Sequence, residues 1–486
     1  MLTDNPAQRS RAAYVTIHKN DIVRKMNSAA NIDVIILAAG QGTRMKSALT
    51  KVLHPVGGQA LISHVIEAAK SLANTKIHII VGQNASAVKK HVLNAHPDLE
   101  VNWAMQTEQL GTGHAVLQAL PNLDTANTAL ILCGDVPLIK SGELNKLIET
   151  AALNQLALLT TALDDPTGYG RIIRDTEGNV CKIVEHRDCD DSQRATREIN
   201  TGFMALPVSM LSSALSKLEN NNDQQEYYLT DVIKLAKAQG DSVTGICTND
   251  FSSVLGVNSR SDLAQCEKHY QMRRAQTYMD AGVSIIDPAR VTFRGSVSIE
   301  PDCSLDINTI IEGPTCIGSN VVIGANSIVR GSVLADGCRI EPNCVIEDAH
   351  VGASAVLGPF ARIRPGSKLS ENVRIGNFVE VKNSTLAAGA KANHLSYVGD
   401  SDIGASTNIG AGVITCNYDG AYKHRTVIGE NVFVGSDCQL VAPVTIGNNA
   451  TIGAGTTVTT DVEADTLSIS RTKQKSVQGW KRPTKK

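Results

Sequence analysis

A glycine-rich segment near the N-terminus carries basic side chains at a spacing suited to phosphate chemistry. The apolar run 32–38 leads into Gly40 and Gly42, and Arg44 and Lys51 follow. Glycines after a strand permit a tight turn that brings backbone N–H groups toward phosphate oxygens. The two cations would stabilise negative charge gathering on a phosphorus atom under attack. The segment has neither a Walker GK[ST] ending nor the GxGxxG dinucleotide pattern, so it predicts a different phosphate site.

A carboxylate follows a second strand of the same region. Asp135 stands directly after the apolar run 129–133 and Gly134. Ligands of α/β sheets collect at the carboxyl ends of the strands. Taken alone, an aspartate at such a place is more often a turn or cap residue, so its chemical role depends on the residues around it.

The elements that must position these residues change type along the chain. Strand-like runs at 32–38, 76–82, 129–133 and 157–162 alternate with helical stretches, which predicts an α/β domain with a largely parallel sheet. From Ile299 onward an aliphatic residue returns every sixth position in three uninterrupted runs. A period of six fits neither a helix nor a half-buried strand. It predicts short strands stacked as a solenoid over about 287–460, with the aliphatic residue inside.

The predicted domain organisation follows from this change of pattern. We expect a flexible N-terminal extension over 1–30, an α/β domain over 31–258, a linker helix over 259–284, and a solenoid domain with a basic tail over 285–486; the resemblance described below makes the α/β domain a nucleotidyltransferase and the solenoid a β-helix. The solenoid period slips by one residue at Leu334, Val351, Leu386 and Ile403. Longer insertions are expected at 387–397 and 411–427, where binding groups would project.

Bulk composition narrows the range of functions. A formal net charge of −2 over 486 residues gives no reason to expect binding to nucleic acid or to a membrane surface. No apolar run approaches the roughly 18 residues of a membrane span, and residues 1–30 do not resemble a secretion signal. The 11 cysteines are scattered and form no CxxC pair. These features predict a cytoplasmic protein with reduced thiols.

The six-residue repeat resembles the left-handed parallel β-helix that many acyltransferases share. The first half resembles the sugar-nucleotide pyrophosphorylases through the string GxGTRM, the stretch 106–114, Gly-Asp-Val-Pro at 134–137 and Gly-Val-Asn-Ser-Arg at 256–260. The resemblance implies a Rossmann-like domain and Mg²⁺ held by Asp135 and Asn258, because oxygen ligands suit a hard octahedral ion. It implies that UTP and the sugar contact residues Leu37, Ala38, Ala39, Gly40, Arg44, Lys51, Gln106, Gly111, Thr112, Asp135, Gly170, Glu185, Asn200 and Asn258.

Both halves together resemble the bacterial bifunctional enzymes that act as N-acetylglucosamine-1-phosphate uridyltransferase and glucosamine-1-phosphate N-acetyltransferase. The resemblance runs from about residue 32 to the end and includes the strings ITCNYDG (414–420) and FVGSDCQLVAPV (433–444). It implies that acetyl-CoA acetylates glucosamine-1-phosphate and that UTP then converts the product to UDP-N-acetylglucosamine. Homotrimers with the acyl donor between neighbouring solenoids are also implied by the resemblance.

The acetyltransferase residues follow from that resemblance. His394 is the expected base, because an imidazole titrates near neutral pH and can accept the ammonium proton. Arg364 and Lys382 are expected to clamp the sugar phosphate. Further sugar contacts are expected at Tyr397 and Asn408. Contacts with acetyl-CoA are expected at Ala411, whose N–H would meet the thioester oxygen, and at Asn417, Tyr418, Ser436, Ala454 and Arg471. The chain departs from the family at Cys133, where relatives often carry Tyr, and at Asn393, where they often carry Gly.

Two other interpretations compete with this one. The solenoid could be a structural or regulatory platform attached to a nucleotidyltransferase, which would leave His394 without a catalytic role. It could alternatively hold a metal ion between three histidines, as in γ-class carbonic anhydrases. The irregular offsets of His350, His394 and His424 argue against a metal site.

Overall fold

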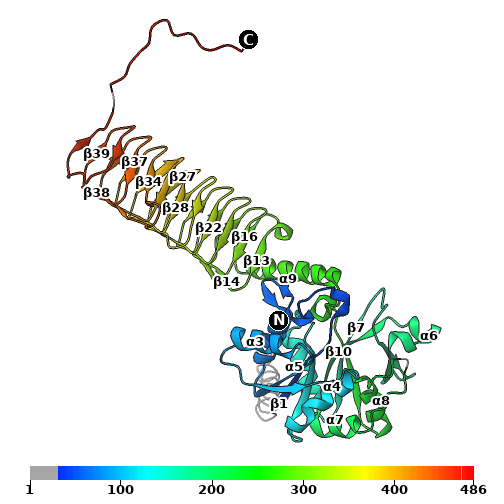
Figure 1. The fold of residues 1–486 in the computed structure, drawn as a ribbon. Coiled ribbons are helices and arrows are strands. Elements are labelled where there is room, and N and C mark those ends of the chain that lie inside the picture. Colours follow the sequence, from blue (N-terminus) through cyan, green and yellow to red (C-terminus); the bar gives the residue numbers. More distant parts are fainter. Residues whose placement is uncertain (1–30, 223, 472, 486) are drawn as a thin grey trace, which may run out of the picture. The chain divides into compact units, whose positions relative to one another are not determined.

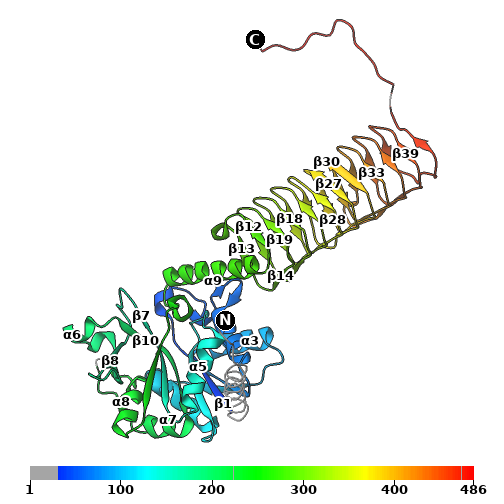
Figure 2. The same ribbon diagram turned by 180° about the vertical axis from the view of Figure 1, so that it is seen from behind.

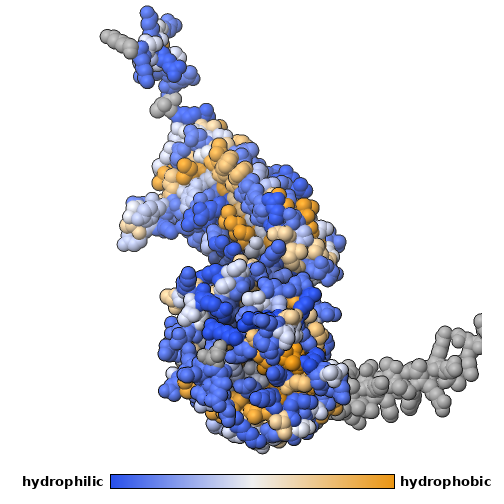
Figure 3. All heavy atoms as spheres, turned by 90° about the vertical axis from the view of Figure 1, so that its right-hand side faces the viewer, coloured by the Kyte–Doolittle hydropathy of each residue, from blue (hydrophilic) through white to orange (hydrophobic). Residues whose placement is uncertain are grey.

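The computed structural model describes residues 31–485 except 223 and 472, so the extension predicted over 1–30 lies outside the described residues. Contacts divide the chain into two compact units at Tyr270 and Gln271. Figure 1 and Figure 2 show an α/β unit and a solenoid unit. In a space-filling view the surface is largely hydrophilic, with apolar groups scattered over both units (Figure 3).

The first unit is built on a mixed sheet in the order β11-β7-β10-β6-β1-β4-β5. Its strands are β1 (Ile32–Ala38), β4 (Thr75–Val81), β5 (Val101–Met105), β6 (Thr128–Cys133), β7 (Leu156–Ala162), β8 (Arg171–Arg174), β9 (Val180–Val184), β10 (Glu198–Pro207) and β11 (Val243–Cys247). The strands β5, β4, β1 and β6 pair in parallel, as does β11 with β7. Strand β10 runs antiparallel to both β6 and β7, so the expected largely parallel sheet is interrupted at its centre.

Helices cover both faces of this sheet and complete two cores. The described helices are α2 (Leu61–Lys70), α3 (Ala85–Ala95), α4 (Thr112–Ala119), α5 (Ser141–Ala151), α6 (Asp191–Arg194), α7 (Val208–Leu215) and α8 (Asp231–Ala238). Alternate residues of β1 face opposite ways: Val34 and Ile36 join one core and Ile35 joins the other. Because both faces are buried, β1 appears in the sequence as a continuous apolar run.

A short hairpin and a long helix lie next to this sheet. The hairpin pairs β2 (Pro55–Val56) with β3 (Gln59–Ala60). Helix α9 (Arg260–Asp280) falls within the predicted linker over 259–284. Its first half belongs to the α/β unit, where the N–H of Gly57 donates to Glu267 over 2.7 Å and the rings of His64 and Tyr270 meet edge to face.

The second unit is a three-sided coil of short parallel strands, one from each sheet in every turn. The first sheet contains β12 (Ser284–Ile285), β15 (Ser304–Leu305), β18 (Val322–Ile323), β21 (Arg339–Ile340), β24 (Val356–Leu357), β27 (Arg374–Asn377), β30 (Lys391–His394), β33 (Asn408–Ile409), β36 (Phe433–Val434), β39 (Thr451–Ile452) and β41 (Leu467–Ser468). The second contains β13 (Thr292–Arg294), β16 (Ile310–Glu312), β19 (Ile328–Arg330), β22 (Val345–Glu347), β25 (Arg362–Ile363), β28 (Glu380–Lys382), β31 (Tyr397–Gly399), β34 (Ile414–Cys416), β37 (Gln439–Val441) and β40 (Thr457–Val458). The third contains β14 (Val297–Ile299), β17 (Thr315–Ile317), β20 (Val333–Leu334), β23 (His350–Val351), β26 (Lys368–Leu369), β29 (Thr385–Leu386), β32 (Ser401–Ile403), β35 (Thr426–Ile428) and β38 (Val444–Ile446).

The six-residue repeat is the inward position of these strands. Residues such as Leu305, Ile311 and Ile363 are fully buried in one continuous core. Partners in adjacent coils lie 18 residues apart, or 17 where the sequence slips by one, as between Ile317 and Leu334. Each coil therefore takes three hexapeptides.

One of the two expected insertions is wrong. Residues 387–397 continue the regular coil, because Ala392 is fully buried at the inward position and pairs with Ile375. Ala392 interrupts the six-residue pattern of large aliphatic residues in the sequence, but it still occupies the inward position of a regular coil. The other insertion is real: Ile403 pairs with Ile428, 25 residues later, and the extra chain forms a loop over 417–425.

Candidate active sites

The glycine-rich segment forms a turn at the carboxyl end of β1. Gly42 has a φ of 64° and precedes the short 3-10 helix η1 (Thr43–Met45). A Cβ at Gly42 would lie 2.6 Å from the Cβ of Lys51, so only glycine lets the loop lie against the lysine stem. Lys51 begins a second 3-10 helix, η2 (Lys51–Leu53).

Three residues distant in sequence meet beside this loop. The ammonium of Lys51 donates to Oδ2 of Asp135 over 2.5 Å and to Oδ1 of Asn258 over 3.2 Å. Asn258 precedes α9, and its N–H donates to Asp262, which also accepts from Ser259 at the start of that helix. The two predicted metal ligands thus face one common point, now filled by a cationic group.

A cavity of about 300 Å³ opens at this place. Its walls contain nine of the predicted nucleotide contacts: Leu37, Ala38, Ala39, Gly40, Lys51, Gln106, Gly111, Thr112 and Asp135. The amide of Gln106 donates to the carbonyl of Gly111 over 3.0 Å. Gln109, which the sequence analysis did not select, also lines the cavity and donates to the carbonyl of Ala39 over 2.8 Å. Gln109 could have been selected from the sequence because it lies within the stretch 106–114 that was predicted to contact the nucleotide.

The predicted sugar contacts lie close to one another. The N–H of Asn200 donates to the carbonyl of Gly170 over 2.8 Å, and a Cβ at Gly170 would approach the carboxylate of Glu185. Burial raises the pKa of Glu185, which accepts a hydrogen bond from Thr230 over 3.1 Å. Arg44 is exposed; the structure does not include it in the cavity wall.

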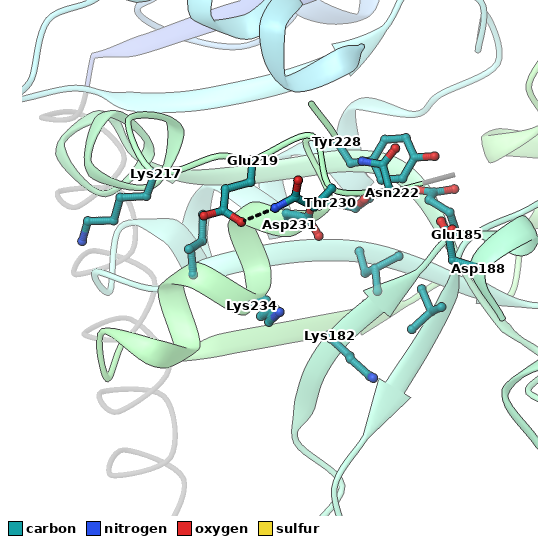
Figure 4. Close-up of a pocket in the computed structure, with 14 residues that line it drawn as sticks. Lys182, Glu185, Asp188, Lys217, Glu219, Asn222, Tyr228, Thr230, Asp231 and Lys234 are labelled. Carbon is teal, nitrogen blue, oxygen red and sulfur yellow. Dashed lines mark hydrogen bonds between the residues drawn. The ribbon is translucent and has the colours of Figure 1, made fainter. Parts of the chain in front are cut away.

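Glu185 also borders a second cavity of about 490 Å³. Figure 4 shows Glu185 and Asp188 at one end of it and Lys217 at the other. Its lysines are spread apart rather than gathered around one point. Of the predicted contacts only Glu185 belongs to this wall, so the larger cavity does not coincide with the predicted chemistry.

The departure at Cys133 falls in the cavity beside the glycine-rich loop. Cys133 ends β6 and lines the wall, and a Cβ at Gly202 would lie 2.8 Å from its sulfur. Burial, with the nearby charge of Asp135, raises the pKa of the Cys133 thiol to about 12. This cysteine is therefore a neutral space-filling group at neutral pH.

In the solenoid, His394 lies at a corner where the first sheet passes into the second. Its Nδ1 is 3.0 Å from Oδ1 of Asn377, the residue at the same position one coil earlier. An amide oxygen only accepts, so Nδ1 donates the hydrogen of this contact, and in the neutral ring the lone pair is on Nε2. Asn377 was missed by the sequence analysis, although a residue one coil before a candidate base is findable once the coil length is known.

The same corner continues through the next coils. The inward residues Ala392, Ile409, Val434 and Ile452 pair in series. Two positions beyond each of them stand His394 and three residues expected to contact acetyl-CoA: Ala411, Ser436 and Ala454. The carbonyl of Ala411 accepts from Asp437, and that of Ser436 accepts from Gly455. We call His394, Ala411, Ser436 and Ala454 the corner row.

A column of charges follows the last residues of the second sheet. Signs alternate through four coils, with pairs Arg294–Glu312 at 3.4 Å and Arg330–Glu347 at 3.1 Å. By the register, Arg364 and Lys382 occupy the next two places, so two cations become neighbours. Arg364 also bonds Glu380 over 2.7 Å, which raises its pKa, and Lys382 is 3.9 Å from Asp400. The column thus changes from alternating signs to two adjacent cations, each of which also contacts a carboxylate.

A further cation comes from the inserted loop. Lys423, which the sequence analysis did not select, lies beside Lys382, and its hydrogen bond and like charge with that residue lower the pKa of Lys423. Although burial opposes it, hydrogen bonds from Asn383 and Asn417 lower the pKa of Asp400, which keeps a fixed negative charge beneath the lysines. Such a cluster suits a dianionic phosphate.

The other predicted contacts are placed as follows. The Tyr397 ring lies over Gly399, and Asn417 donates to its hydroxyl over 3.4 Å and to Asp400. Asn408 is half-buried at the start of β33. Tyr418 is 61% exposed on the inserted loop, and Arg471 lies beside Gly453, the residue before Ala454. Asn393 continues strand β30, and its carbonyl fills the space that a Cβ at Gly376 would need.

Comparison with known proteins finds relatives that cover both units of the chain. Residues 34–225 match the MobA-like NTP transferase domain, residues 425–460 match the bacterial transferase hexapeptide repeats, and residues 293–373 match the GMPPB C-terminal domain. The chain is 52% identical over 456 residues to the bifunctional protein GlmU of Stutzerimonas stutzeri, covering 94% of this chain and all of that protein. GlmU of Azoarcus sp. is 50% identical over 93% of this chain and all of its own, and GlmU of Cellvibrio japonicus 49% over 94% and all.

The chain belongs to the GlmU family of bifunctional proteins. It is a uridyltransferase and N-acetyltransferase that synthesises UDP-N-acetylglucosamine, with an α/β nucleotidyltransferase domain and a left-handed parallel β-helix of hexapeptide repeats. The predicted family, fold class and activities are confirmed, and the purely structural solenoid is thereby disfavoured.

Two further observations bear on the remaining expectations. Within the described residues, no helix has the length and apolar character needed to cross a membrane. The same part of the chain contains no group of three metal-ligating His, Cys, Asp or Glu side chains. His424 is 2.7 Å from Asp419 on the inserted loop, so the carbonic anhydrase-like alternative finds no support in its geometry.

Proposed function

We propose that the cavity beside the glycine-rich loop is the uridylyl-transfer site. The backbone of Leu37–Gly40 would meet the nucleotide, and Gln106, Gly111 and Thr112 would read the uracil. Gly170, Glu185 and Asn200 would bind the sugar. A phosphate oxygen of N-acetylglucosamine-1-phosphate attacks the α-phosphorus of UTP, the α–β P–O bond breaks, and pyrophosphate leaves. Arg44 and Lys51 would stabilise the charge that develops on the phosphoryl oxygens.

The residues present fit a magnesium ion at this site. Oδ2 of Asp135 and Oδ1 of Asn258 converge on one cationic group, so both oxygens can serve a common ion. Two oxygen ligands completed by phosphates and water are what Mg²⁺ requires. When bound, Mg²⁺ would shield the phosphate charge during transfer. The protein's part is to hold the two oxygens in place, Asn258 through Asp262.

We propose that His394 is the base of the acetyltransferase. Asn377 holds its ring in the tautomer with a free Nε2. Nε2 takes a proton from the amine of glucosamine-1-phosphate, the nitrogen attacks the thioester carbonyl, and the C–S bond breaks to release CoA, which receives the proton. The N–H of Ala411 would bind the carbonyl oxygen as its charge develops.

The substrates of this second reaction have matching surroundings. Arg364, Lys382 and Lys423 would bind the sugar phosphate, with Tyr397 and Asn408 beside the sugar ring. The corner row continues from His394 through Ala411 to Ser436 and Ala454, along which acetyl-CoA would extend toward Arg471. Asn417 and Tyr418 would complete its binding site. Asn377 next to His394 is the single observation on which the base assignment rests most.

Order of addition to the whole protein tests this scheme. UTP and glucosamine-1-phosphate are incubated with Mg²⁺, and pyrophosphate is measured before and after acetyl-CoA is added. We expect release of pyrophosphate to begin only after CoA release, because the uridylyl acceptor must first be acetylated. Equal pyrophosphate release without acetyl-CoA would contradict the proposed sequence of reactions.

We propose that the protein is cytoplasmic and that three chains assemble through the solenoid. Phe360, Phe378 and Leu395 form an exposed apolar ridge next to His394, with the two rings 5.2 Å apart. All three have positive φ, between 48° and 58°. This left-handed conformation costs an L residue roughly 1–2 kcal/mol. Comparable turns in the described solenoid have small or polar residues. A neighbouring solenoid packing on the ridge would explain why bulky residues occupy it.

Sedimentation measures this assembly directly. We expect the protein to sediment as a trimer and the triple variant Phe360→Asn, Phe378→Asn, Leu395→Asn to sediment as smaller species. Asparagine suits positive φ, so the variant should stay folded. A trimer unchanged in the variant would exclude the ridge as the contact.

A further inference from the structure

In the α/β unit, the side chain of Lys51 occupies the position proposed for the magnesium ion. The ammonium of Lys51 contacts the same two oxygens that are expected to hold the ion, Oδ2 of Asp135 at 2.5 Å and Oδ1 of Asn258 at 3.2 Å. The side chains of Lys51 and Asp135 are only 14% and 18% exposed. An ion pair so shielded from water is stronger than one on the surface.

We propose that Lys51 is a placeholder cation: without nucleotide its ammonium occupies the metal position, and the phosphates of the nucleotide draw it away. The divalent ion and UTP then bind cooperatively, because each is helped by the displacement of the same side chain. This inference rests on the proposed magnesium site and adds to it a role for Lys51 in setting when the metal can bind.

The charges make the two cations mutually exclusive. The ammonium neutralises Asp135 and satisfies the amide oxygen of Asn258, so a divalent ion must displace it from both oxygens. Mg²⁺ needs its oxygen ligands at about 2.0–2.1 Å, which leaves no room for an ammonium in hydrogen-bond contact with the same atoms. Repulsion between the two positive charges adds to this competition.

The surroundings of Lys51 allow such an exchange. Its stem packs against Gly42, so its root is fixed while the flexible four-carbon chain can redirect the ammonium. Lys51 lines the same cavity as Gly40, beside the backbone expected to meet phosphates. Phosphate charge there would attract the ammonium and free Asp135. A static structural ion pair would not respond to phosphate in this way.

Direct measurement of Mn²⁺ binding tests the proposal without relying on turnover. Free Mn²⁺ is followed by electron paramagnetic resonance in the nucleotide-free whole protein, for wild type, Lys51→Met, Lys51→Arg and Lys146→Ala. Lys51→Met keeps the stem and removes the charge, so we expect Mn²⁺ to bind about tenfold more tightly, or about 1.4 kcal/mol. Lys51→Arg keeps the charge and Lys146→Ala removes a remote exposed one; both should stay within twofold of wild type.

The opposite sign is expected for the nucleotide. UTP binding to Lys51→Met in Mn²⁺ should weaken, because the phosphates lose a cation, whereas Lys146→Ala should bind UTP as wild type does. Lys51→Met with unchanged or weaker Mn²⁺ binding, while folded by circular dichroism, would overturn the placeholder role.

A second substitution separates this inference from the metal assignment beneath it. Adding Asp135→Asn to Lys51→Met should weaken Mn²⁺ binding, since the proposed ligand is lost. If Mn²⁺ binding in the double variant equals that of Lys51→Met, the metal site proposed at Asp135 is wrong. If Asp135→Asn weakens binding but Lys51→Met alone does not strengthen it, the site stands and only the placeholder is excluded.

Discussion

The two units assemble their candidate sites by opposite means. In the α/β unit, Lys51 meets Asp135 from 84 positions away and Asn258 from 207. In the solenoid, Asn377 and His394 are 17 positions apart, which is one coil. An irregular domain gathers its chemistry by folding distant segments together, whereas a repeat places it by changing side chains at an unchanged backbone position.

This contrast also affects enclosure and charge. The cavity beside the glycine-rich loop has walls from β1, β6 and α4, whereas His394 lies exposed on a corner of the solenoid. In the α/β unit, the acid Asp135 is neutralised by Lys51, and in the solenoid the alternating column of charges ends in two adjacent cations, Arg364 and Lys382. Independent sites of this kind should be separable by single substitutions.

The largest effect is expected from His394→Ala. Loss of the base should lower acetyl transfer about 10²–10⁴-fold, measured as CoA release, while uridylyl transfer to N-acetylglucosamine-1-phosphate stays unchanged. His350→Ala, on an exposed strand position, is the control. A His394→Ala variant with full acetyltransferase activity would show that the solenoid site does not depend on His394 as its base.

The reciprocal change is Asp135→Asn. We expect pyrophosphate release to fall about 10²–10³-fold, because one charge-stabilising group at the reaction centre is removed. Acetyl transfer by the same protein should be unaffected. Glu149→Gln, on the exposed face of α5, removes a carboxylate without touching the cavity. An equal loss in both activities would mean that the two sites are not independent.

A smaller effect should follow from Asn377→Ala. Losing one hydrogen bond to His394, worth about 1 kcal/mol, should reduce kcat for acetylation severalfold, with little change in KM. Asn377→Asp keeps an oxygen acceptor and should restore part of the rate. If the alanine variant changes KM alone, Asn377 binds substrate rather than orienting the base.

Acid should unfold the two units at different pH. Burial lowers the pKa of His64, His91 and His96 in the α/β unit. The unfolded chain then binds more protons, so this unit loses stability as pH falls below about 6.5. In the solenoid, the hydrogen bond from Arg425 lowers the pKa of Asp402, so that contribution persists until pH falls below about 4. Near-ultraviolet circular dichroism of Trp103 in the α/β unit should change first; a solenoid that unfolds before it would contradict the assignment.

The same contrast explains how much could be predicted from the sequence. The six-residue period predicted the solenoid and its inward residues because every strand places one residue in the same kind of buried position. It failed at Ala392, where a small residue still fills the inward position. Helix α9 was predicted from Ser259 at its start and Gly282 at its end, and strands β1 and β6 were predicted from apolar runs followed by glycine. The antiparallel direction of β10 did not, since strand direction depends on pairing between distant segments.

Site geometry was less accessible than residue type. Lys51 and Asp135 were selected from their chemistry and their place after strands, and Asn258 by resemblance, but the contact of all three depends on tertiary structure. Lys423 was missed because a single lysine in a loop has no pattern; only its position beside Lys382 reveals it. The left-handed turn positions of Phe360 and Phe378 were equally invisible, since bulky residues rarely adopt that conformation.

The corner row has a consequence for redesign. Neighbouring coils are spaced by about 4.8 Å, the separation of paired strands, so successive positions of the corner row are equally spaced along the solenoid. Moving His394 and Asn377 together by one coil would shift the reactive nitrogen by that fixed distance relative to the acyl donor. The solenoid could thus be redesigned to acetylate longer or shorter amines by placing these side chains in another coil, with no change to its backbone.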